Sequence, residues 1–198
     1  MGAILQSLNR TIVAGFVLLV VLLAIIGQVT GKWVSLNTEG WWMFGFRWLH
    51  VMSGIMWIGL LWYFNFVQTP SMPKIPDEQK PAISKVIAPA ALFWFRWAAL
   101  ATVVTGLLLA GINRYLVAAL SLQGDTVAIG IGMWLGLVMA FNVWFIIWPN
   151  QKKALGMVQV GAEEKATAAR KAGLTSRLNT LLSIPMLYCM VAQQNGGL

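Results

Sequence analysis

The feature that most constrains this chain is an almost uniformly aliphatic run, Thr11–Gly31 (TIVAGFVLLVVLLAIIGQVTG). As a helix it would measure about 30 Å, which is the thickness of the hydrocarbon core of a bilayer. The run is too long for the apolar region of a removed signal peptide, and it lacks a small-residue cleavage site. It therefore predicts a membrane-spanning anchor.

Four further apolar segments follow this run. Only 10% of the 198 residues are charged and 59% are hydrophobic, whereas soluble domains carry roughly 25% charged residues. We therefore predict an all-α integral membrane protein, a bundle of about five transmembrane helices in one domain covering residues 1–198. The five spans are expected at residues 11–31, 43–66, 90–111, 126–148 and 174–192.

Prolines mark the expected ends of several spans. The segment 70–88 is predicted to be a surface loop, because closely spaced prolines interrupt helical hydrogen bonding. Pro149 is expected to end the fourth helix, and Pro185 to kink the fifth. The prolines in and beside the loop are Pro70, Pro73, Pro76, Pro81 and Pro89.

Basic residues gather in the segments on one side of the predicted spans. The other side has little beyond Lys32 and Arg114, so the positive-inside rule predicts a cytoplasmic N-terminus and an outside C-terminus. This pattern accounts for the net charge of +8 without a nucleic-acid partner, and it predicts a multi-pass membrane protein. The basic residues on the N-terminal side are Arg10, Lys74, Lys80, Lys85, Lys152, Lys153, Lys165, Arg170 and Lys171.

The second span contains the single histidine of the chain, His50. An ionisable group inside a membrane is costly unless it is paired, hydrogen-bonded or ligated, which makes it a candidate functional residue. Arg47 and Gly54 lie one turn before and one turn after it on the same helical face. A cation, a nitrogen ligand and a position without a side chain suit a flat anionic cofactor, so we predict a heme b site with His50 as the metal ligand. The alternative is a histidine that only hydrogen-bonds to a neighbouring helix.

One histidine per chain leaves three alternatives for the second axial position of such a heme. The position would be open, or occupied by a methionine, or occupied by His50 of a second copy of the chain. Met133 and Met186 are expected at the depth of His50, because they lie about seven and six residues from the same side of the membrane. They are the candidate methionine ligands.

Other polar and small residues in the spans have more ordinary explanations. Arg96, between Trp94 and Trp97, is expected to extend its charge toward the interface. Asn142 is expected to bond across the bundle, and the Gly132/Gly136 spacing permits close helix packing and self-association. The single cysteine, Cys189, excludes a disulfide framework and a thiolate metal site.

Two stretches resemble a known family. The segment WLHVMSGIMWIGLLWYFNFV resembles the first membrane motif of the bacterial membrane-bound urate oxidase (urate hydroxylase) family. The segments NVWFIIWPNQKK and LNTLLSIPMLYCM resemble the closing helices of its N-terminal membrane domain, and WFRW also fits. The resemblance implies a location in the bacterial inner membrane and electron flow through the membrane domain to a cytochrome c. More loosely, His50 with Trp57-Ile58-Gly59 is similar to a heme-synthesis membrane oxidase in which such a histidine binds heme.

The 198 residues contain no CxxCH motif and fewer histidines than the long members of this family, so we expect a short form without the cytochrome c domain. Three functions follow as hypotheses. The first is a heme-b electron-transfer protein, and the second is a cofactor-free structural or accessory subunit that oligomerises. The third is a urate oxidase that uses a separate cytochrome c or respiratory partner, with Arg47, Arg96 and tryptophans binding the urate anion. Paired carboxylates, a nucleophile–base pair and a phosphate loop are all missing, which argues against hydrolase and nucleotide chemistry.

Overall fold

The computed structural model describes residues 2–197 of the chain. Helices make up 85% of the structure, and the described residues contain no strand, which confirms the predicted all-α class. The chain divides into two compact units, residues 1–42 and 43–198.

The smaller unit contains α1 (Gly2–Leu5) and α2 (Leu8–Thr30). Nearly every side chain of α2 is exposed, as expected of a helix whose apolar surface faces lipid. Gly27 is buried because the ring of Trp33 folds back against it. The first predicted span is confirmed as a helix long and apolar enough to cross a membrane.

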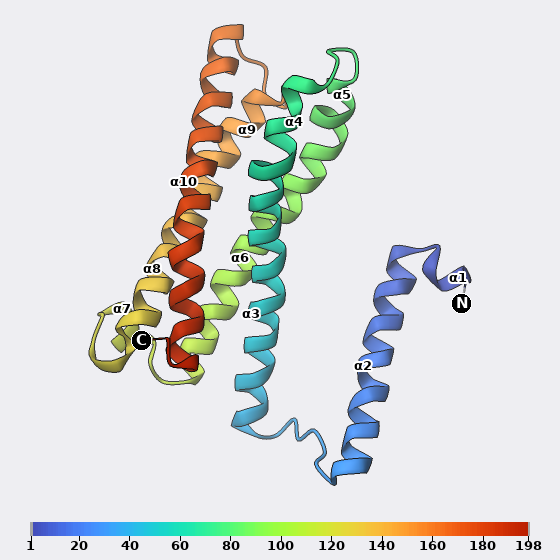
Figure 1. Cartoon of the computed structure of the whole chain (residues 1–198), viewed down its shortest axis with the longest axis vertical. Coiled ribbons are helices and arrows are strands. Elements are labelled where there is room, and N and C mark those ends of the chain that lie inside the picture. Colours follow the sequence, from blue (N-terminus) through green and yellow to red (C-terminus); the bar gives the residue numbers. More distant parts are fainter. Residues whose placement is uncertain (1, 198) are drawn as a thin grey trace. The chain divides into compact units, whose positions relative to one another are not determined.

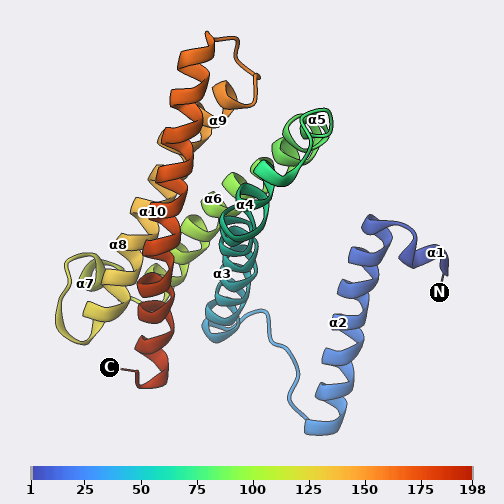
Figure 2. The same cartoon turned by 45° about the horizontal axis from the view of Figure 1, so that its top comes forward.

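The larger unit is a bundle of long helices joined by short ones (Figures 1 and 2). The helices α8 and α10 lie side by side along much of their length, and the short helix α7 packs against α8. In chain order, the segments are α3 (Glu39–Trp62), η1 (Tyr63–Gln68), α4 (Thr69–Ser71), η2 (Met72–Lys74), α5 (Lys80–Ala82), η3 (Ile83–Ile87), α6 (Ala88–Ile112), α7 (Leu116–Leu120), η4 (Gly124–Thr126), α8 (Val127–Phe141), η5 (Asn142–Ile147), α9 (Trp148–Ala154) and α10 (Ala162–Asn195).

Three helical stretches of this bundle, Glu39–Lys74, Lys80–Ile112 and Gly124–Ala154, are long and apolar enough to span a membrane. With α2 they make four such helices in the described residues. The expected fifth span, 174–192, lies within the 34-residue helix α10. The helix α10 is long enough to cross but less apolar than the other four, because its first half is rich in charged residues.

The predicted loop at 70–88 is wrong in extent, and so is the predicted helix end at Pro149. Only residues 75–79 are non-helical in the first case, and α9 continues to Ala154 in the second. The π-helical segments η1, η3 and η5 each end two residues before a proline, namely Pro70, Pro89 and Pro149. A proline has no N–H for the carbonyl four residues earlier, and its ring clashes with that carbonyl, whereas the i→i+5 bonds donated by Thr69, Ala88 and Trp148 widen the helix in the turn before each proline. The wider register therefore carries each helix past its proline.

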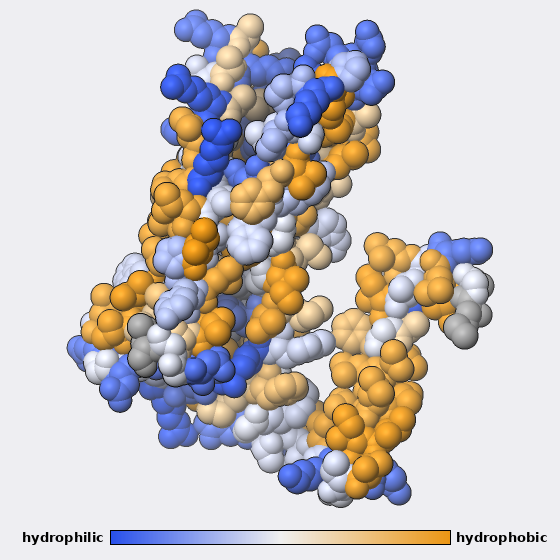
Figure 3. Space-filling model, in the orientation of Figure 1, coloured by the Kyte–Doolittle hydropathy of each residue, from blue (hydrophilic) through white to orange (hydrophobic). Residues whose placement is uncertain are grey.

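The interior of the bundle is apolar, with a few polar links between helices. Trp57, Phe95 and Met139, for example, are at most 2% exposed. The Nδ2 of Asn142 donates to Oδ1 of Asn179 at 2.8 Å, which confirms the bond expected across the bundle. On the face shown in Figure 3, hydrophilic residues gather at the two ends of the bundle and apolar residues cover most of its middle. This distribution suits a membrane-spanning unit.

Candidate functional site

The imidazole of His50 is held by a backbone group on the neighbouring helix. Its Nδ1 lies 2.9 Å from the carbonyl oxygen of Thr102 on α6. A carbonyl only accepts, so Nδ1 carries the proton and donates to it, and the lone pair is left on Nε2. Within the described residues Nε2 makes no hydrogen bond. This is the arrangement of a histidine that ligates a metal through Nε2, with its orientation set by the bond from the other nitrogen.

The bond between His50 and Thr102 depends on a close approach that the sequence analysis missed. A Cβ atom on Gly106 of α6 would lie 2.8 Å from Cε1 of His50 and 3.0 Å from Nδ1. Only glycine leaves the imidazole room at this point. The hydroxyl of Thr105 lies 3.4 Å from Nδ1 and adds a second polar neighbour.

A cavity of about 610 Å³ adjoins His50, within the size range of small-molecule and cofactor sites. Its walls come from α3, α6, α8 and α10, and most of the lining side chains are apolar. Along α3 it reaches from Arg47 to Trp62, about 22 Å at the rise of an α-helix. All five residues predicted for the site line this cavity: Arg47, His50, Gly54, Met133 and Met186.

Polar side chains collect at one end of the cavity. Arg47 comes from the first turns of α3, Gln194 and Asn195 from the last turn of α10, and Tyr115 from the connection between α6 and α7. Burial raises the pKa of the Tyr115 phenol, and the nearby charge of Arg47 opposes part of that increase. The phenol therefore stays protonated at neutral pH. This end of the cavity offers one cation and several hydrogen-bond donors.

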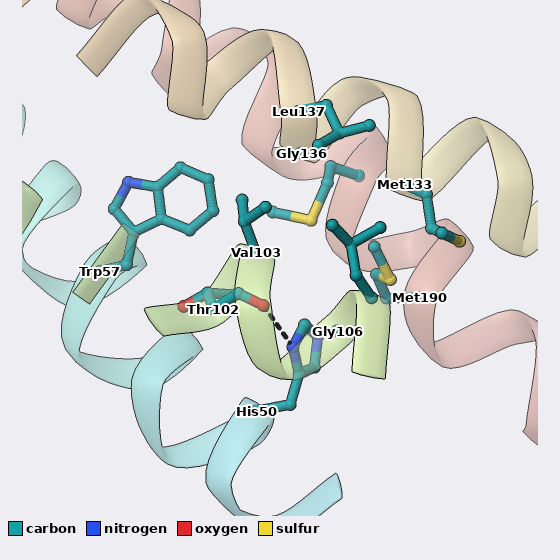
Figure 4. Close-up of a pocket in the computed structure, with 11 residues that line it drawn as sticks. His50, Trp57, Thr102, Val103, Gly106, Met133, Gly136, Leu137 and Met190 are labelled. Carbon is teal, nitrogen blue, oxygen red and sulfur yellow. Dashed lines mark hydrogen bonds between the residues drawn. The ribbon is translucent and has the colours of Figure 1, made fainter. Parts of the chain in front are cut away.

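The wall opposite α3 contains three methionines. Met133 of α8 and Met186 and Met190 of α10 line a smaller part of the site together with His50. Figure 4 shows the imidazole directed at α6, with Met133 and Met190 coming from the two helices beyond it. Gly54 has open space beside it, since a Cβ there would meet only Cγ2 of Thr102 at 3.9 Å. The residues that hold the imidazole are on α6, and the three methionines are on α8 and α10.

Arg96 does not line this cavity. Its guanidinium carbon lies 3.7 Å from the ring centroid of Trp148, near the opposite end of the bundle from Arg47. The structure therefore does not bring Arg47 and Arg96 together, as one shared binding site for a urate anion would require.

The profile of the urate oxidase N-terminal family matches residues 117–196, from the second residue of α7 to the residue after α10. This stretch, which is less than half of the chain, is similar to the urate oxidase N-terminal family. The match confirms the resemblance carried by NVWFIIWPNQKK and LNTLLSIPMLYCM, which lie inside it. No curated protein and no solved structure matches the chain.

The urate oxidase N-terminal match covers one side of the cavity. Met133, Met186 and Met190 fall within it, together with Gln194 and Asn195 at the polar end. The opposite side, with Arg47, His50 and Gly54, lies outside the matched residues. The site is thus assembled from the matched residues and from two preceding helices, α3 and α6.

Proposed function

We propose that the bundle binds heme b in the cavity beside His50 and transfers electrons within the bacterial inner membrane. The observation that carries the proposal is the state of His50: Nδ1 donates to the carbonyl of Thr102, and Nε2 keeps its lone pair next to a cavity of about 610 Å³. An imidazole in this state is a ready ligand for iron.

The residues around the cavity fit a heme in two respects. The walls are apolar, as a porphyrin ring requires, and the polar end offers Arg47 to the anionic propionates. Gly54 leaves room for the ring edge, because nothing in the described structure approaches its missing side chain closer than 3.9 Å. When bound, the heme would supply one-electron transfer, while His50, Thr102 and Arg47 would hold and orient it.

A methionine from α8 or α10 would complete the iron coordination. Met133 and Met186 line the cavity with His50, and a thioether ligand raises the reduction potential of a heme relative to a second histidine. Replacing the ligating methionine with leucine should lower the midpoint potential, whereas the same change at the other methionine should leave it nearly unchanged. If this coordination position were open, or were occupied by His50 of another copy of the chain, neither methionine change should alter the midpoint potential.

The similarity to the urate oxidase N-terminal family supports a place for this bundle in urate oxidation, with a separate cytochrome c or respiratory protein receiving the electrons.

We also propose that the chain self-associates. Gly132 already packs against α10 of the same chain, since a Cβ there would lie 3.2 Å from Cβ of Cys189. An interface between copies would therefore use other surfaces. A strict monomer in mild detergent and in nanodiscs would contradict it.

The deciding experiment is an optical spectrum of the detergent-purified protein, expressed with added heme and recorded oxidised and reduced. Wild-type protein should show a Soret band, and His50→Ala should abolish it. Gly54→Leu should lower heme occupancy without lowering the unfolding temperature. Arg47→Ala should retain some heme at a lower potential, because a positive charge near the propionates is lost.

A matched control for Gly54→Leu is Gly111→Leu on α6. Gly111 is exposed, does not line the cavity, and has nothing within 4 Å of the point where a Cβ atom would lie, so its replacement should leave the Soret band unchanged. Wild-type protein without a Soret band would overturn the heme proposal. It would favour the second candidate, a cofactor-free accessory subunit, which agrees with the position of His50 outside the family match.

A further inference from the structure

A second polar site lies at the other end of the bundle and is independent of the function proposed for His50. Its centre is the indole ring of Trp148, at the start of α9. The guanidinium carbon of Arg96 lies 3.7 Å from the ring centroid, and Nζ of Lys152 lies 5.6 Å from it. Two positive charges thus share one aromatic ring.

Neither cation has an anionic partner in the described part of the chain. One amino group of Arg96 is fully buried and makes no hydrogen bond. The neighbouring Lys153 is different, because its Nζ pairs with Oε1 of Glu164 at 2.6 Å. The ion pair with Glu164 therefore neutralises Lys153, while the positive charges of Lys152 and Arg96 have no anionic partner in the described residues.

A guanidinium in a membrane-spanning segment is costly unless its charge and its N–H donors are satisfied. Contact with an aromatic face offsets only part of that cost. The fork of Arg96 matches a phosphate, which accepts two parallel hydrogen bonds, and Lys152 adds a second charge. The ligand chemistry that fits is a phosphate group.

The position of the site indicates where that phosphate comes from. Lys152 lies in the last turn of α9, and the exposed lysines Lys74, Lys85 and Lys165 come from segments at this same end of the bundle. Basic clusters at one side of a membrane protein attract anionic lipids, and pockets between helices bind their head groups. We propose that Arg96 and Lys152, on the platform of Trp148, bind the phosphate of an anionic phospholipid.

The test is native mass spectrometry of the full chain released from nanodiscs that contain equal amounts of phosphatidylglycerol and phosphatidylcholine. Wild-type protein should retain phosphatidylglycerol selectively. Arg96→Met should reduce that retention by about tenfold or more, since a charge-assisted bidentate contact is lost. Arg96→Lys should give an intermediate loss, because the charge remains while the planar fork does not.

The matched control is the adjacent lysine. Lys152→Gln should weaken phosphatidylglycerol retention, whereas Lys153→Gln should not, because Lys153 is already paired with Glu164. Circular dichroism of each variant checks that the bundle is folded, and the Arg96→Lys variant decides the case if Arg96→Met is unfolded. Equal retention of the two lipids by wild-type protein would overturn the proposal. If inorganic phosphate alone stabilised the protein against heat as much as phosphatidylglycerol does, the proposal that the bound phosphate belongs to a lipid would be wrong.

Discussion

Gly106 is the residue on which the geometry of His50 depends most directly. It belongs to α6, while His50 belongs to α3, and the two meet where α6 presents the carbonyl of Thr102 to the imidazole. A glycine at this point allows the ring to approach the α6 backbone. No pattern within the second span indicates it, because the two partners are more than fifty positions apart in the chain.

Replacing Gly106 with alanine should displace the imidazole. The added methyl group would lie 2.8 Å from Cε1 of His50, so the ring or α6 must shift. We expect a loss of about 1–3 kcal/mol in the free energy of unfolding, the usual cost of an overpacked core. Denaturant unfolding in detergent measures it, with Gly111→Ala on the same helix as the control. Equal stabilities of the two variants would show that α6 yields to the methyl group at no cost.

At the scale of helices, the prolines interrupt helical structure less than their close spacing predicts. The backbone N–H groups of Thr69, Ala88 and Trp148 donate to carbonyls five residues earlier, so each of these helices changes register just before its proline. The helix α10 stays α-helical through Pro185 without such a segment. The predicted kink at that residue stays a prediction.

The link between η5 and α10 rests on an amide pair. Asn142 donates to Asn179, and Nδ2 of Asn179 donates in turn to the carbonyl of Met139 at 2.9 Å. Asn142→Leu should lower the free energy of unfolding by about 1 kcal/mol, the scale of interhelical hydrogen bonds in membranes. The Asn142→Leu, Asn179→Leu double variant in a thermodynamic cycle isolates the coupling. A coupling energy of zero would mean that the bond contributes nothing to stability.

The contact between α7 and α8 depends on Gly130. A Cβ on Gly130 would overlap the carbonyl oxygen of Ala119 at the end of α7. Gly130→Ala should therefore separate α7 from α8 and raise amide hydrogen exchange across Leu116–Leu120. Gly136→Ala on the same helix is the control, since nothing lies within 4 Å of a side chain there. Unchanged exchange in the Gly130 variant would contradict the close packing.

At the scale of the whole molecule, the basic residues predict an orientation. The end of the bundle formed by the α5, α9 and early α10 segments contains most of its lysines, and the opposite end contains α7 and the C-terminus (Figure 1). From the positive-inside rule we expect the lysine-rich end to lie in the cytoplasm.

Cysteine labelling of intact cells tests this orientation. After replacement of Cys189 by serine, a cysteine at Glu78 should stay unlabelled by a membrane-impermeant thiol reagent. A cysteine at Gln123 should be labelled, because this exposed residue lies in the connection at the opposite end. The reverse labelling pattern would show that the predicted orientation is wrong.

The sequence by itself determined the fold class of the protein and predicted one face of its candidate site. Apolar runs long enough to span a bilayer indicate helices, because backbone groups must pair within the membrane and a helix pairs them inside one segment. The single histidine, with Arg47 and Gly54 one turn away on either side, indicated the face of α3 that lines the cavity. These inferences use only short-range periodicity, which a sequence displays directly.

Only the tertiary structure decided which groups meet that face. Thr102 and Gly106 hold the imidazole, Tyr115 and Asn195 form the polar end, and Arg96 lies on Trp148 rather than near Arg47. Each of these contacts joins helices that are distant in the chain, so it depends on how the helices are rotated and offset against one another. Helix packing and the π-helical register changes set those rotations, and neither is visible in the hydrophobic pattern of a single span.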